Sequence, residues 1–358
     1  HYNIPGQRTL NGDIIHDICI DKNNNLWIGT EDAGLNKLNM KDHSYTSFND
    51  MKGLSQNCIH GLASIDNHLW IGTHANGIDL MDIRTEKIIK HYTISVNPYA
   101  NKNDIIVYLY KLQNNDLLVA TALGVYQYNS QKDIFEQLSQ FPNNCRIQTL
   151  FEDHDGVIWA GTSSKGLYYY NPATSQHGEF KLDTVNTSRT INNIYEDRKN
   201  NLWFATGDGI KIYDRSTQQT TKYDMQDGLP SNVIYRIEED KKGNMWISTA
   251  NGLARLNPKN HKIKVFKKEH GLTSNQFNYN SSLKTDNDKL YFGTLKGMIS
   301  FQPNSIQEFS IQPKVYISQI NYNDPGHNFL HQEAITFKKG ITLEHNQSTF
   351  YIDYTSLS

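Results

Sequence analysis

The chain has 358 residues, enough for one large repeat domain or two ordinary domains. Its 35 Lys and Arg nearly balance its 37 Asp and Glu, and this net charge of −2 argues against a nucleic-acid surface, which needs concentrated positive charge. Hydrophobic residues make up 37% of the chain, so a packed core is possible, and no apolar run reaches the roughly 18 residues of a membrane-spanning helix.

The start of the chain and its cysteines say little about location. The first residue is His1 and no signal peptide is visible, so we expect a mature or excised segment of a longer protein. Cys19, Cys58 and Cys145 lie at different phases of the sequence pattern described next. An odd number of cysteines without motif spacing favours free thiols over a disulfide framework.

One short pattern recurs seven times along the chain. Its clearest copy is Asn-Leu-Trp-Ile-Gly-Thr at residues 25–30, followed by Gly34 and a second apolar run. The Thr of successive copies stands at positions 30, 73, 121, 162, 206, 249 and 294, which gives intervals of 43, 48, 41, 44, 43 and 45 residues. A period of roughly 40–50 residues built from short strands is typical of a propeller.

Each repeat reads as four strands in chain order. In the first repeat an alternating apolar strand (14–20) is followed by a polar turn (21–25) whose Asp and Asn residues suit a tight hairpin. The Trp-containing run is the second strand and the run after Gly34 is the third. A more polar fourth strand closes the unit, as at 87–92 and 262–266. We therefore predict an all-β protein: a seven-bladed β-propeller of four-stranded antiparallel blades.

Large and small residues alternate at fixed places in the second strand. All five Trp residues of the chain stand three positions before the repeated Thr, at 27, 70, 159, 203 and 246. The position just before the Thr always carries Gly, Ala or Ser. We expect the indole rings to be buried between neighbouring sheets and the small residues to let those sheets approach closely.

The two ends of the chain differ from the repeats. Residues near 1–5 echo the fourth strand of a blade, and we expect them to supply the outer strand of the last blade and so close the ring. The propeller would then occupy residues 1–312. After Pro313 the echo is absent, and strand-like runs at 315–320, 341–343 and 349–354 predict the start of a truncated β-sandwich over 313–358.

Several of these motifs together resemble the two-component regulator propeller repeat. They are the Asn-Leu-Trp-Ile-Gly-Thr core, its Gly-Leu-x-x-Leu/Tyr-Asn continuation, and a Gly-Leu-x-x-Asn link at 53–57, 228–232 and 271–275. The tail at 341–354 resembles the opening of the Tyr-rich β-sandwich that follows such propellers. The third repeat departs most, since Leu118 replaces Trp and Ala120 replaces Gly, which affects only local packing.

This resemblance implies a part of a hybrid two-component sensor of the kind found in glycan-using gut bacteria. It implies a periplasmic location, an oligosaccharide ligand (neutral or acidic), a second propeller in the same sensor, and a homodimer in the intact protein. The histidine kinase would lie outside this chain, so we expect no enzyme activity, no cofactor, and no contact with nucleic acid or membrane by this segment.

The catalytic motifs we looked for are absent from the sequence. No Gly-x-Ser-x-Gly, phosphate loop, His-Glu-x-x-His or Cys-x-x-Cys occurs. Asp21, Asn23 and Asn25 resemble the start of a calcium loop, but Leu26 stands where that loop needs Gly. The Asp-x-x-Gly-x-x-Trp turns resemble the structural hairpins of sialidase propellers. His16 and His60 lie on adjacent first strands, and we expect channel histidines there rather than a metal pair.

Ligand-binding residues are sought where the repeat pattern fails. Loops between blades and loops between second and third strands emerge on one face of a propeller. The candidates from these loops are Tyr99, Arg146, Arg189, Glu31, Asp32, His74, Lys165, Asp208 and Lys296. A Tyr ring can stack on a sugar, while Arg and Lys can pair with carboxylate or sulfate. The third repeat is the longest, and its extra residues fall in 95–104, which makes Tyr99 the first choice.

Two alternatives remain open. The propeller could be a polysaccharide lyase or hydrolase, which would require two carboxylates or a His–Tyr pair converging over the channel. It could also be a structural spacer that supports dimerisation while another propeller holds the ligand.

Overall fold

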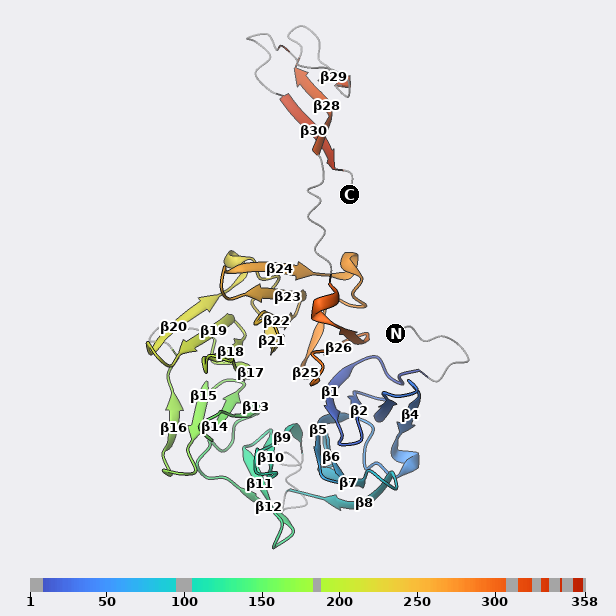
Figure 1. Ribbon diagram of the computed structural model, residues 1–358, viewed down its shortest axis with the longest axis vertical. Helices are drawn as coiled ribbons and strands as arrows, with labels where there is room; N and C mark the ends of the chain where they lie inside the picture. The colour runs from blue at the N-terminus through green and yellow to red at the C-terminus, as the bar shows by residue number, and fades with distance from the viewer. Residues whose placement is uncertain are drawn as a thin grey trace. The chain divides into compact units, whose positions relative to one another are not determined.

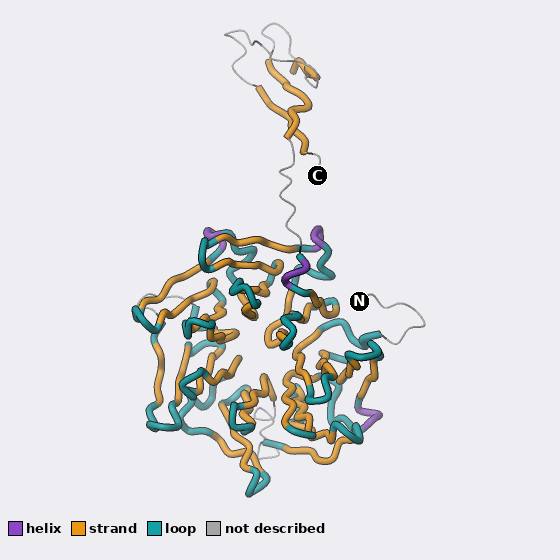
Figure 2. Tube along the Cα trace, viewed as in Figure 1, coloured by secondary structure: helices purple, strands orange, loops and turns teal. Residues whose placement is uncertain are grey.

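Seven antiparallel sheets form a closed ring in the computed structural model (Figures 1 and 2). The structure describes residues 9–94, 105–182, 188–306, 315–323, 330–334, 342 and 350–356. The strands of the first three sheets are β1 Ile15–Ile20, β2 Asn25–Thr30, β3 Leu35–Asn39 and β4 Tyr45–Phe48; β5 Ile59–Ile65, β6 His68–Thr73, β7 Ile78–Asp82 and β8 Lys87–Tyr92; and β9 Ile106–Lys111, β10 Leu117–Thr121, β11 Val125–Asn129 and β12 Ile134–Gln137. Those of the next three are β13 Ile147–Glu152, β14 Ile158–Thr162, β15 Leu167–Tyr170 and β16 His177–Phe180; β17 Ile191–Glu196, β18 Leu202–Thr206, β19 Gly209–Asp214 and β20 Gln219–Tyr223; and β21 Ile234–Glu239, β22 Met245–Thr249, β23 Gly252–Asn257 and β24 Lys262–Phe266. The seventh sheet has β25 Phe277–Lys284, β26 Leu290–Thr294 and β27 Gly297–Phe301.

The first strand of every sheet lies at the centre of the ring, and each contacts the first strand of the next sheet (Figure 1). The ring closes because β25 packs on β1, where Asn278 Nδ2 donates a hydrogen bond to the Ile15 carbonyl at 2.8 Å. The predicted seven-bladed propeller is therefore confirmed. Three strands of the seventh blade are described, and the outer strand expected from residues 1–5 lies outside the described residues.

In four blades, the Asp at the start of the hairpin turn accepts a hydrogen bond from the indole of the Trp six residues later. The Trp Nε1 donates to the Asp carboxylate at 2.9 Å for Asp21, 2.7 Å for Asp153, 2.9 Å for Asp197 and 2.9 Å for Asp240. The same carboxylates accept backbone N–H groups of the turn, such as Asn25 N at 2.8 Å from Asp21. All five Trp rings are buried. The turns are thus structural, as expected, and the Asp21 carboxylate is used within its own hairpin.

The repeated Thr fixes the opposite end of the second strand. In all seven blades its hydroxyl donates to the carbonyl of the Gly that opens the third strand, as Thr30 does to Gly34 at 2.8 Å and Thr249 to Gly252 at 2.8 Å. Every one of these Thr residues is fully buried. A hydroxyl that satisfies a buried carbonyl explains why this position keeps Thr through the repeats.

The small residue before the Thr lies against the next blade. A Cβ built on Gly72 would stand 2.5 Å from Ile106 Cγ2, and one built on Gly161 would stand 2.7 Å from Ile191 Cγ2. Both distances are far inside van der Waals contact. The close approach predicted for these positions is confirmed.

A short 3₁₀ turn precedes each Gly-Leu-x-x-Asn link between blades. The turns are η1 Asp50–Lys52, η2 Met225–Asp227 and η3 Lys268–His270, and a further turn, η4, covers Pro303–Ser305. In the first link Gly53 ends the turn with φ +99°, a conformation that favours Gly. Asn57 Oδ1 then accepts the Asp50 N–H at 2.8 Å. The link is therefore a structural connector.

A buried polar network occupies the centre of the ring. The Arg236 guanidinium of β21 donates to Ser282 Oγ at 2.9 Å, lies over the Tyr108 ring at 5.6 Å, and is buried. Ser282 donates in turn to Glu238 at 2.7 Å. Asp17 of β1, whose carboxylate accepts the Leu62 N–H at 2.7 Å, feels the charge of Arg236. Residues of the third, sixth and seventh blades thus meet at one guanidinium, whose charge also acts on Asp17 of the first blade.

The chain divides into two compact units at Ser305 and Ile306. The second unit contains a three-stranded antiparallel sheet of order β29-β28-β30, with β28 at Val315–Asn323, β29 at Leu330–Ala334 and β30 at Phe350–Ser356. Strands near 315–320 and 349–354 were expected; β29 was not. In the described part of the chain no helix has the length and apolar character needed to cross a bilayer. The three cysteines are free, with Cys145 buried and the other two half-buried.

Candidate functional site

Two adjacent blades place a histidine at the same irregular position of the first strand. The pairing register shifts between Ile15 and Asp17 in β1 and between Ile59 and Gly61 in β5. A β-bulge of this kind re-aims the side chain that stands in it. The side chains at the two bulges are His16 and His60; both are 4% exposed, and their ring centroids lie 4.2 Å apart.

The backbone N–H of the residue after the repeated Thr donates a hydrogen bond to the residue just before the first strand of the same blade. Glu31 N donates to the Ile14 carbonyl at 3.0 Å, and His74 N donates to the Cys58 carbonyl at 2.9 Å. The five other blades carry Ala122, Ser163, Gly207, Ala250 and Leu295 at this position. Two neighbouring blades therefore bring ionisable or metal-ligating side chains to a place where the rest of the ring has small or apolar ones.

These side chains gather into one group, which we name the histidine cluster: His16, Glu31, Cys58, His60 and His74. His16 Nε2 hydrogen-bonds Glu31 Oε2, and His60 Nε2 lies 3.9 Å from the same oxygen. The rings of His60 and His74 are 4.7 Å apart. The possible ligand atoms of Cys58, His60 and His74 all lie within 4.8 Å of one another, as do those of His16, Glu31 and His60.

The protonated nitrogen of His16 follows from its surroundings. Asn278 Nδ2 donates to the Ile15 carbonyl at 2.8 Å, while its Oδ1 accepts the Tyr279 N–H at 3.0 Å, which sets the orientation of the amide. The same Nδ2 lies 3.4 Å from His16 Nδ1. That nitrogen is then the acceptor, and in the neutral ring the proton stands on Nε2 and is donated to Glu31.

Burial keeps the two inner histidines neutral. Desolvation lowers the pKa of His16 although Glu31 opposes the shift. Desolvation, together with the nearby His16, His74 and Arg146, lowers the pKa of His60 to about 2. Desolvation and the neighbouring Glu31 raise the pKa of the Cys58 thiol to about 12. Neutral imidazoles with free lone pairs can accept hydrogen bonds or bind a metal ion.

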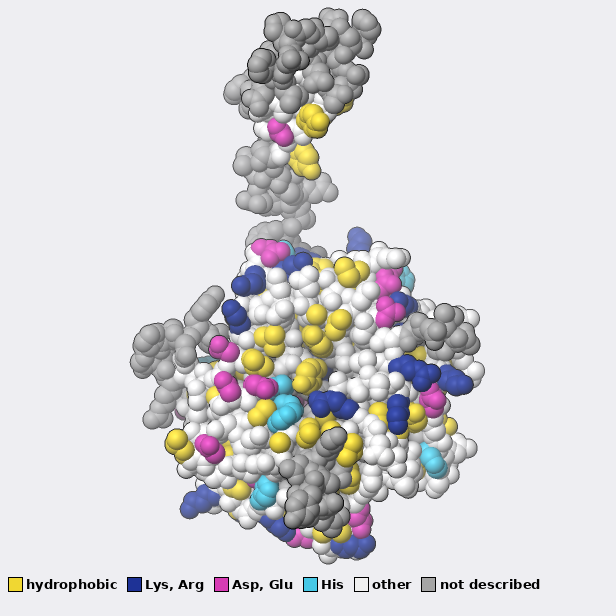
Figure 3. Space-filling model, turned by 180° about the vertical axis from the view of Figure 1, so that it is seen from behind, with side chains coloured by type: hydrophobic (Ala, Val, Ile, Leu, Met, Phe, Trp, Pro, Cys, Tyr) yellow, Lys and Arg dark blue, Asp and Glu magenta, His cyan; other side chains and the backbone are white. Residues whose placement is uncertain are grey.

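Aromatic and basic groups border the histidine cluster. The Tyr279 ring of β25 meets His16 edge-on at 5.7 Å between centroids. Arg146, which is half-buried, donates from Nε to Gln148 Oε1 at 2.8 Å, and its charge acts on both inner histidines. Figure 3 shows histidine side chains beside acidic and basic ones near the middle of one face of the propeller.

The candidate residues chosen from sequence are only partly brought together. His74, Glu31 and Arg146 belong to or border the histidine cluster. Asp208 instead forms an ion pair with Lys222 at 2.9 Å. Arg189 and Lys296 are exposed, and Lys165 is exposed with its Nζ 3.4 Å from the Asn143 carbonyl. Asp32 is exposed beside Glu31, and Tyr99 lies outside the described residues.

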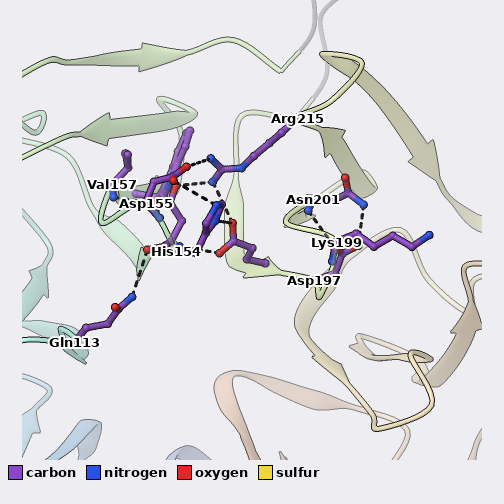
Figure 4. Close-up of polar contacts among 11 residues, drawn as sticks. Gln113, His154, Asp155, Val157, Asp197, Lys199, Asn201 and Arg215 are labelled. Atoms are coloured by element: carbon purple, nitrogen blue, oxygen red, sulfur yellow. Dashed lines mark hydrogen bonds and ion pairs between the residues drawn. The ribbon is translucent and has the colours of Figure 1, made fainter. Parts of the chain in front are cut away.

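A second polar group lies at the opposite ends of the sheets, where first and second strands are joined (Figure 4). The Arg215 guanidinium contacts Asp153 at 2.6 Å, Asp155 at 2.9 Å and Glu196 at 3.2 Å. His154 Nδ1 lies 2.6 Å from Glu196 Oε1. Because each carboxylate is already paired between two blades, we interpret this group as a brace rather than a binding site.

Sequence reasoning missed the histidine cluster as a unit. His16 and His60 were recognised as neighbours and Glu31 and His74 as loop residues, but Cys58 was treated as an isolated thiol. The signal was present: only the first two repeats carry His at the bulge together with Glu or His after the Thr. Comparing repeats at those two positions would have joined the residues.

Four segments of the chain match a known repeat. Segments 9–32, 140–164, 187–208 and 228–251 match the model of the two component regulator propeller. The ring therefore contains repeats of the two-component regulator propeller type, as the sequence motifs predicted. No match to the model covers the C-terminal unit, so the β-sandwich expected there stays a prediction.

Particular relatives narrow the comparison. "Histidine kinase P4" of Formosa agariphila is 28% identical over 414 residues, covering 96% of this chain and 27% of that protein. This chain therefore spans about a quarter of the length of that relative. The extracellular domain of a putative hybrid two component system from B. thetaiotaomicron superposes with a TM-score of 0.77 at 24% identity, covering 98% of this chain and 47% of the other.

An enzyme shares the fold as well. Virginiamycin B lyase from Staphylococcus aureus superposes with a TM-score of 0.65 at 16% identity, covering 82% of this chain and 96% of the lyase. At these identities the structural matches show the fold alone. The presence of a lyase among them means that the propeller fold by itself does not exclude catalysis.

Proposed function

We propose that this chain is the sensor module of a hybrid two-component signalling protein, located outside the cytoplasm in the periplasm. The observation that carries the proposal is the ring of two-component regulator repeats, in a chain related along nearly its whole length to a histidine kinase. The kinase would be encoded in the same protein beyond this segment. Ligand binding to the propeller would then favour one of two states of the C-terminal unit.

The proposed ligand is a glycan fragment, including acidic ones, and its contact surface is the face that carries the histidine cluster. Supporting this choice, Arg146 borders the cluster with a group that can pair with a carboxylate or sulfate, and Tyr279 offers an aromatic ring. The exposed Lys165, Arg189 and Lys296 extend from loops that emerge at the same ends of the sheets. The expected homodimer and partner propeller belong to the intact sensor.

Calorimetry of this chain against neutral, uronic-acid and sulfated oligosaccharides tests the proposal. We expect one saturable binder and a loss of that binding in Arg146→Ala. The matched control is Arg215→Lys, which changes the brace at the opposite ends of the sheets and is expected to leave binding intact. Failure of every oligosaccharide to bind would favour the structural spacer, and a parent gene without a kinase would overturn the sensor assignment.

One observation supports an enzyme as the second candidate. His16 and Tyr279 form a His–Tyr pair at the centre of the ring, with Glu31 hydrogen-bonded to the histidine. Such a group could move a proton during cleavage of an acidic polysaccharide. Incubation with polyuronates and sulfated polysaccharides, followed by chromatography of the products, decides the point. Turnover abolished in Tyr279→Phe would replace the sensor proposal with a lyase or hydrolase.

A further inference from the structure

We propose that Cys58, His60, His74 and Glu31 form a binding site for a transition-metal cation of the Zn²⁺ type at the centre of one propeller face. The sequence predicted no metal: the turn at Asp21 lacks the Gly of a calcium loop, and only the pair His16 and His60 was recognised in the histidine cluster. The structure adds a thiol, a third imidazole and a carboxylate to that pair.

The ligand atoms already lie near the spacing that a metal requires. Those of Cys58, His60 and His74 are all within 4.8 Å of one another, and Glu31 Oε2 is 3.9 Å from His60 Nε2. Zinc bonds of about 2.0–2.3 Å in a tetrahedron separate ligand atoms by roughly 3.3–3.8 Å. Glu31 falls in a second group with His16 and His60, so the exposed His74 and Glu31 side chains would have to rotate to bring all four ligand atoms onto one ion.

His60 shows that something is missing from this group. Its ring is buried, yet its Nδ1 makes no hydrogen bond of normal geometry among the described residues, and a backbone interaction with Ile106 is its other polar contact. Its Nε2 faces Glu31 at 3.9 Å, which is beyond hydrogen-bond range. Burying an imidazole nitrogen without a hydrogen-bond partner lowers the stability of the fold unless another group contacts that nitrogen. A cation between His60, Cys58 and His74 supplies that contact.

The fold itself does not require these side chains. The other five blades carry Val107, Gln148, Asn192, Tyr235 and Asn278 at the bulge, and small or apolar residues after the Thr. Packing of the repeat is therefore satisfied without His or Glu. Their accumulation in two adjacent blades, at positions that meet in space, is better explained by a ligand than by folding.

His16 hydrogen-bonds the Glu31 carboxylate and is not itself one of the proposed metal ligands. Asn278 donates to Nδ1 of His16, so Nε2 carries the proton and donates it to Glu31. Such an outer hydrogen bond orients a ligating carboxylate and increases the affinity of many metal sites. We therefore assign His16 as a positioning residue of the site.

The donor set selects the metal. One thiolate, two imidazoles and one carboxylate match the tetrahedral sites of zinc. Calcium and magnesium prefer sites built from oxygen ligands alone. Binding releases the Cys58 proton, since the thiolate is the metal ligand.

The test uses the whole chain, freed of metal by dialysis against a chelator, and zinc chloride as the probe in calorimetry. We expect one equivalent to bind, and Co²⁺ in its place to give the visible absorption of a tetrahedral site and a thiolate charge-transfer band. Cys58→Ser should abolish the charge-transfer band. His74→Ala, at an exposed position, should weaken zinc binding by more than about 100-fold.

Two further variants separate metal binding from folding. His177→Ala changes an exposed histidine of β16 and should leave zinc affinity unchanged. His16→Leu should weaken binding by roughly 10–100-fold, whereas His16→Gln, which keeps an N–H donor, should restore it. Circular dichroism verifies that each variant is folded.

Failure to bind zinc at micromolar concentration would overturn the proposal, as would undiminished binding in both Cys58→Ser and His74→Ala. The inference does not depend on the sensor assignment. A chain that binds zinc but no oligosaccharide keeps the metal site and loses the glycan proposal, and the reverse result does the opposite.

Discussion

At the scale of single residues, the repeated side chains are explained by hydrogen bonds that sequence reasoning could predict only in part. The phase of the five Trp residues predicted their burial, because a large ring at a fixed place in a strand needs a fixed packing partner. The acceptor for each indole N–H was not predicted. It is an Asp six residues earlier in the chain, and only the hairpin brings the two together.

Removing one such acceptor should destabilise the propeller. In Asp240→Ala the Trp246 Nε1 and the Asn244 N–H, bonded to Asp240 at 2.9 Å each, lose a buried partner. Each unsatisfied group costs about 1–3 kcal/mol, so we expect the free energy of unfolding to fall by at least about 2 kcal/mol. Urea denaturation measures the change. The exposed Asp32→Ala serves as control, and an equal loss there would contradict the explanation.

The buried histidines make stability depend on pH. The folded pKa of His60, about 2, lies below its ordinary value of 6.5, so the unfolded chain binds more protons between these values. The contribution of the neutral His60 ring to the free energy of unfolding is complete above pH 6.5. It is lost progressively as the pH falls from 6.5 toward about 2. Across pH 5.5 to 4.5 this one group contributes a slope of about 1.4 kcal/mol per pH unit.

His60→Gln tests this dependence. The variant removes the titrating ring, so its free energy of unfolding should change less steeply between pH 5.5 and 4.5 than that of the parent chain. Denaturation in metal-free buffer at several pH values gives both slopes. His177→Ala, at an exposed site, should keep the parent slope, and identical slopes for His60→Gln and the parent would contradict the assignment.

At the scale of elements, the strands were predictable and the turns between blades were not. The alternation of apolar residues and the repeated Thr marked the second strand of all seven blades. The 3₁₀ turns that precede the Gly-Leu-x-x-Asn links were not foreseen, because an Asn side chain that caps a turn seven residues earlier leaves no periodic signal. The outer strands carry polar residues and were visible only by comparison among repeats.

Close packing of neighbouring sheets predicts opposite outcomes for two glycines. A Cβ on Gly72 would meet Ile106 Cγ2 at 2.5 Å, whereas one on Gly178 in β16 meets nothing nearer than Tyr169 at 3.8 Å. Overpacking costs about 1–3 kcal/mol, and we expect Gly72→Ala to lose that much stability. Gly178→Ala should be neutral or gain less than about 1 kcal/mol, since Ala restricts the unfolded chain.

Thermal and urea denaturation of the two variants provide the comparison. Both changes add one methyl group to a β-strand, so the difference between them isolates the contact with the next blade. Equal free energies of unfolding for Gly72→Ala and Gly178→Ala would contradict the prediction. They would mean that neighbouring sheets accommodate the added methyl group without losing stability.

At the scale of the whole molecule, the number of blades was predictable and the meeting of blades at the centre was not. Seven copies of one pattern imply seven blades, because each copy buries its faces on two neighbours. The histidine cluster and the Arg236 network arise from residues far apart in the sequence, whose positions differ from repeat to repeat. A pattern that averages over repeats hides such departures, and only the closed ring shows which of them meet.

Arg236 should therefore stabilise the ring as a whole. Its guanidinium compensates the buried Glu238, whose pKa burial raises above its ordinary value. Arg236 and Glu238 are connected through the Ser282 hydroxyl rather than by a direct ion pair. Leaving a buried charge without its compensating partner costs about 3–5 kcal/mol, and we expect Arg236→Met to lose a comparable amount at pH 8. In the variant the folded pKa of Glu238 rises further. The folded chain then binds more protons than the unfolded one, and stability falls as the pH increases from about 5 to 8.

The loss relative to the parent chain should thus be smaller at pH 5 than at pH 8. Adding Glu238→Gln to Arg236→Met removes the uncompensated carboxylate, and should recover part of the stability and most of the added pH dependence. Urea denaturation of the single and double variants at the two pH values measures both effects. If the Arg236→Met deficit is the same at both values, the guanidinium acts through packing alone, and the blades at the centre of the ring are not joined by charge.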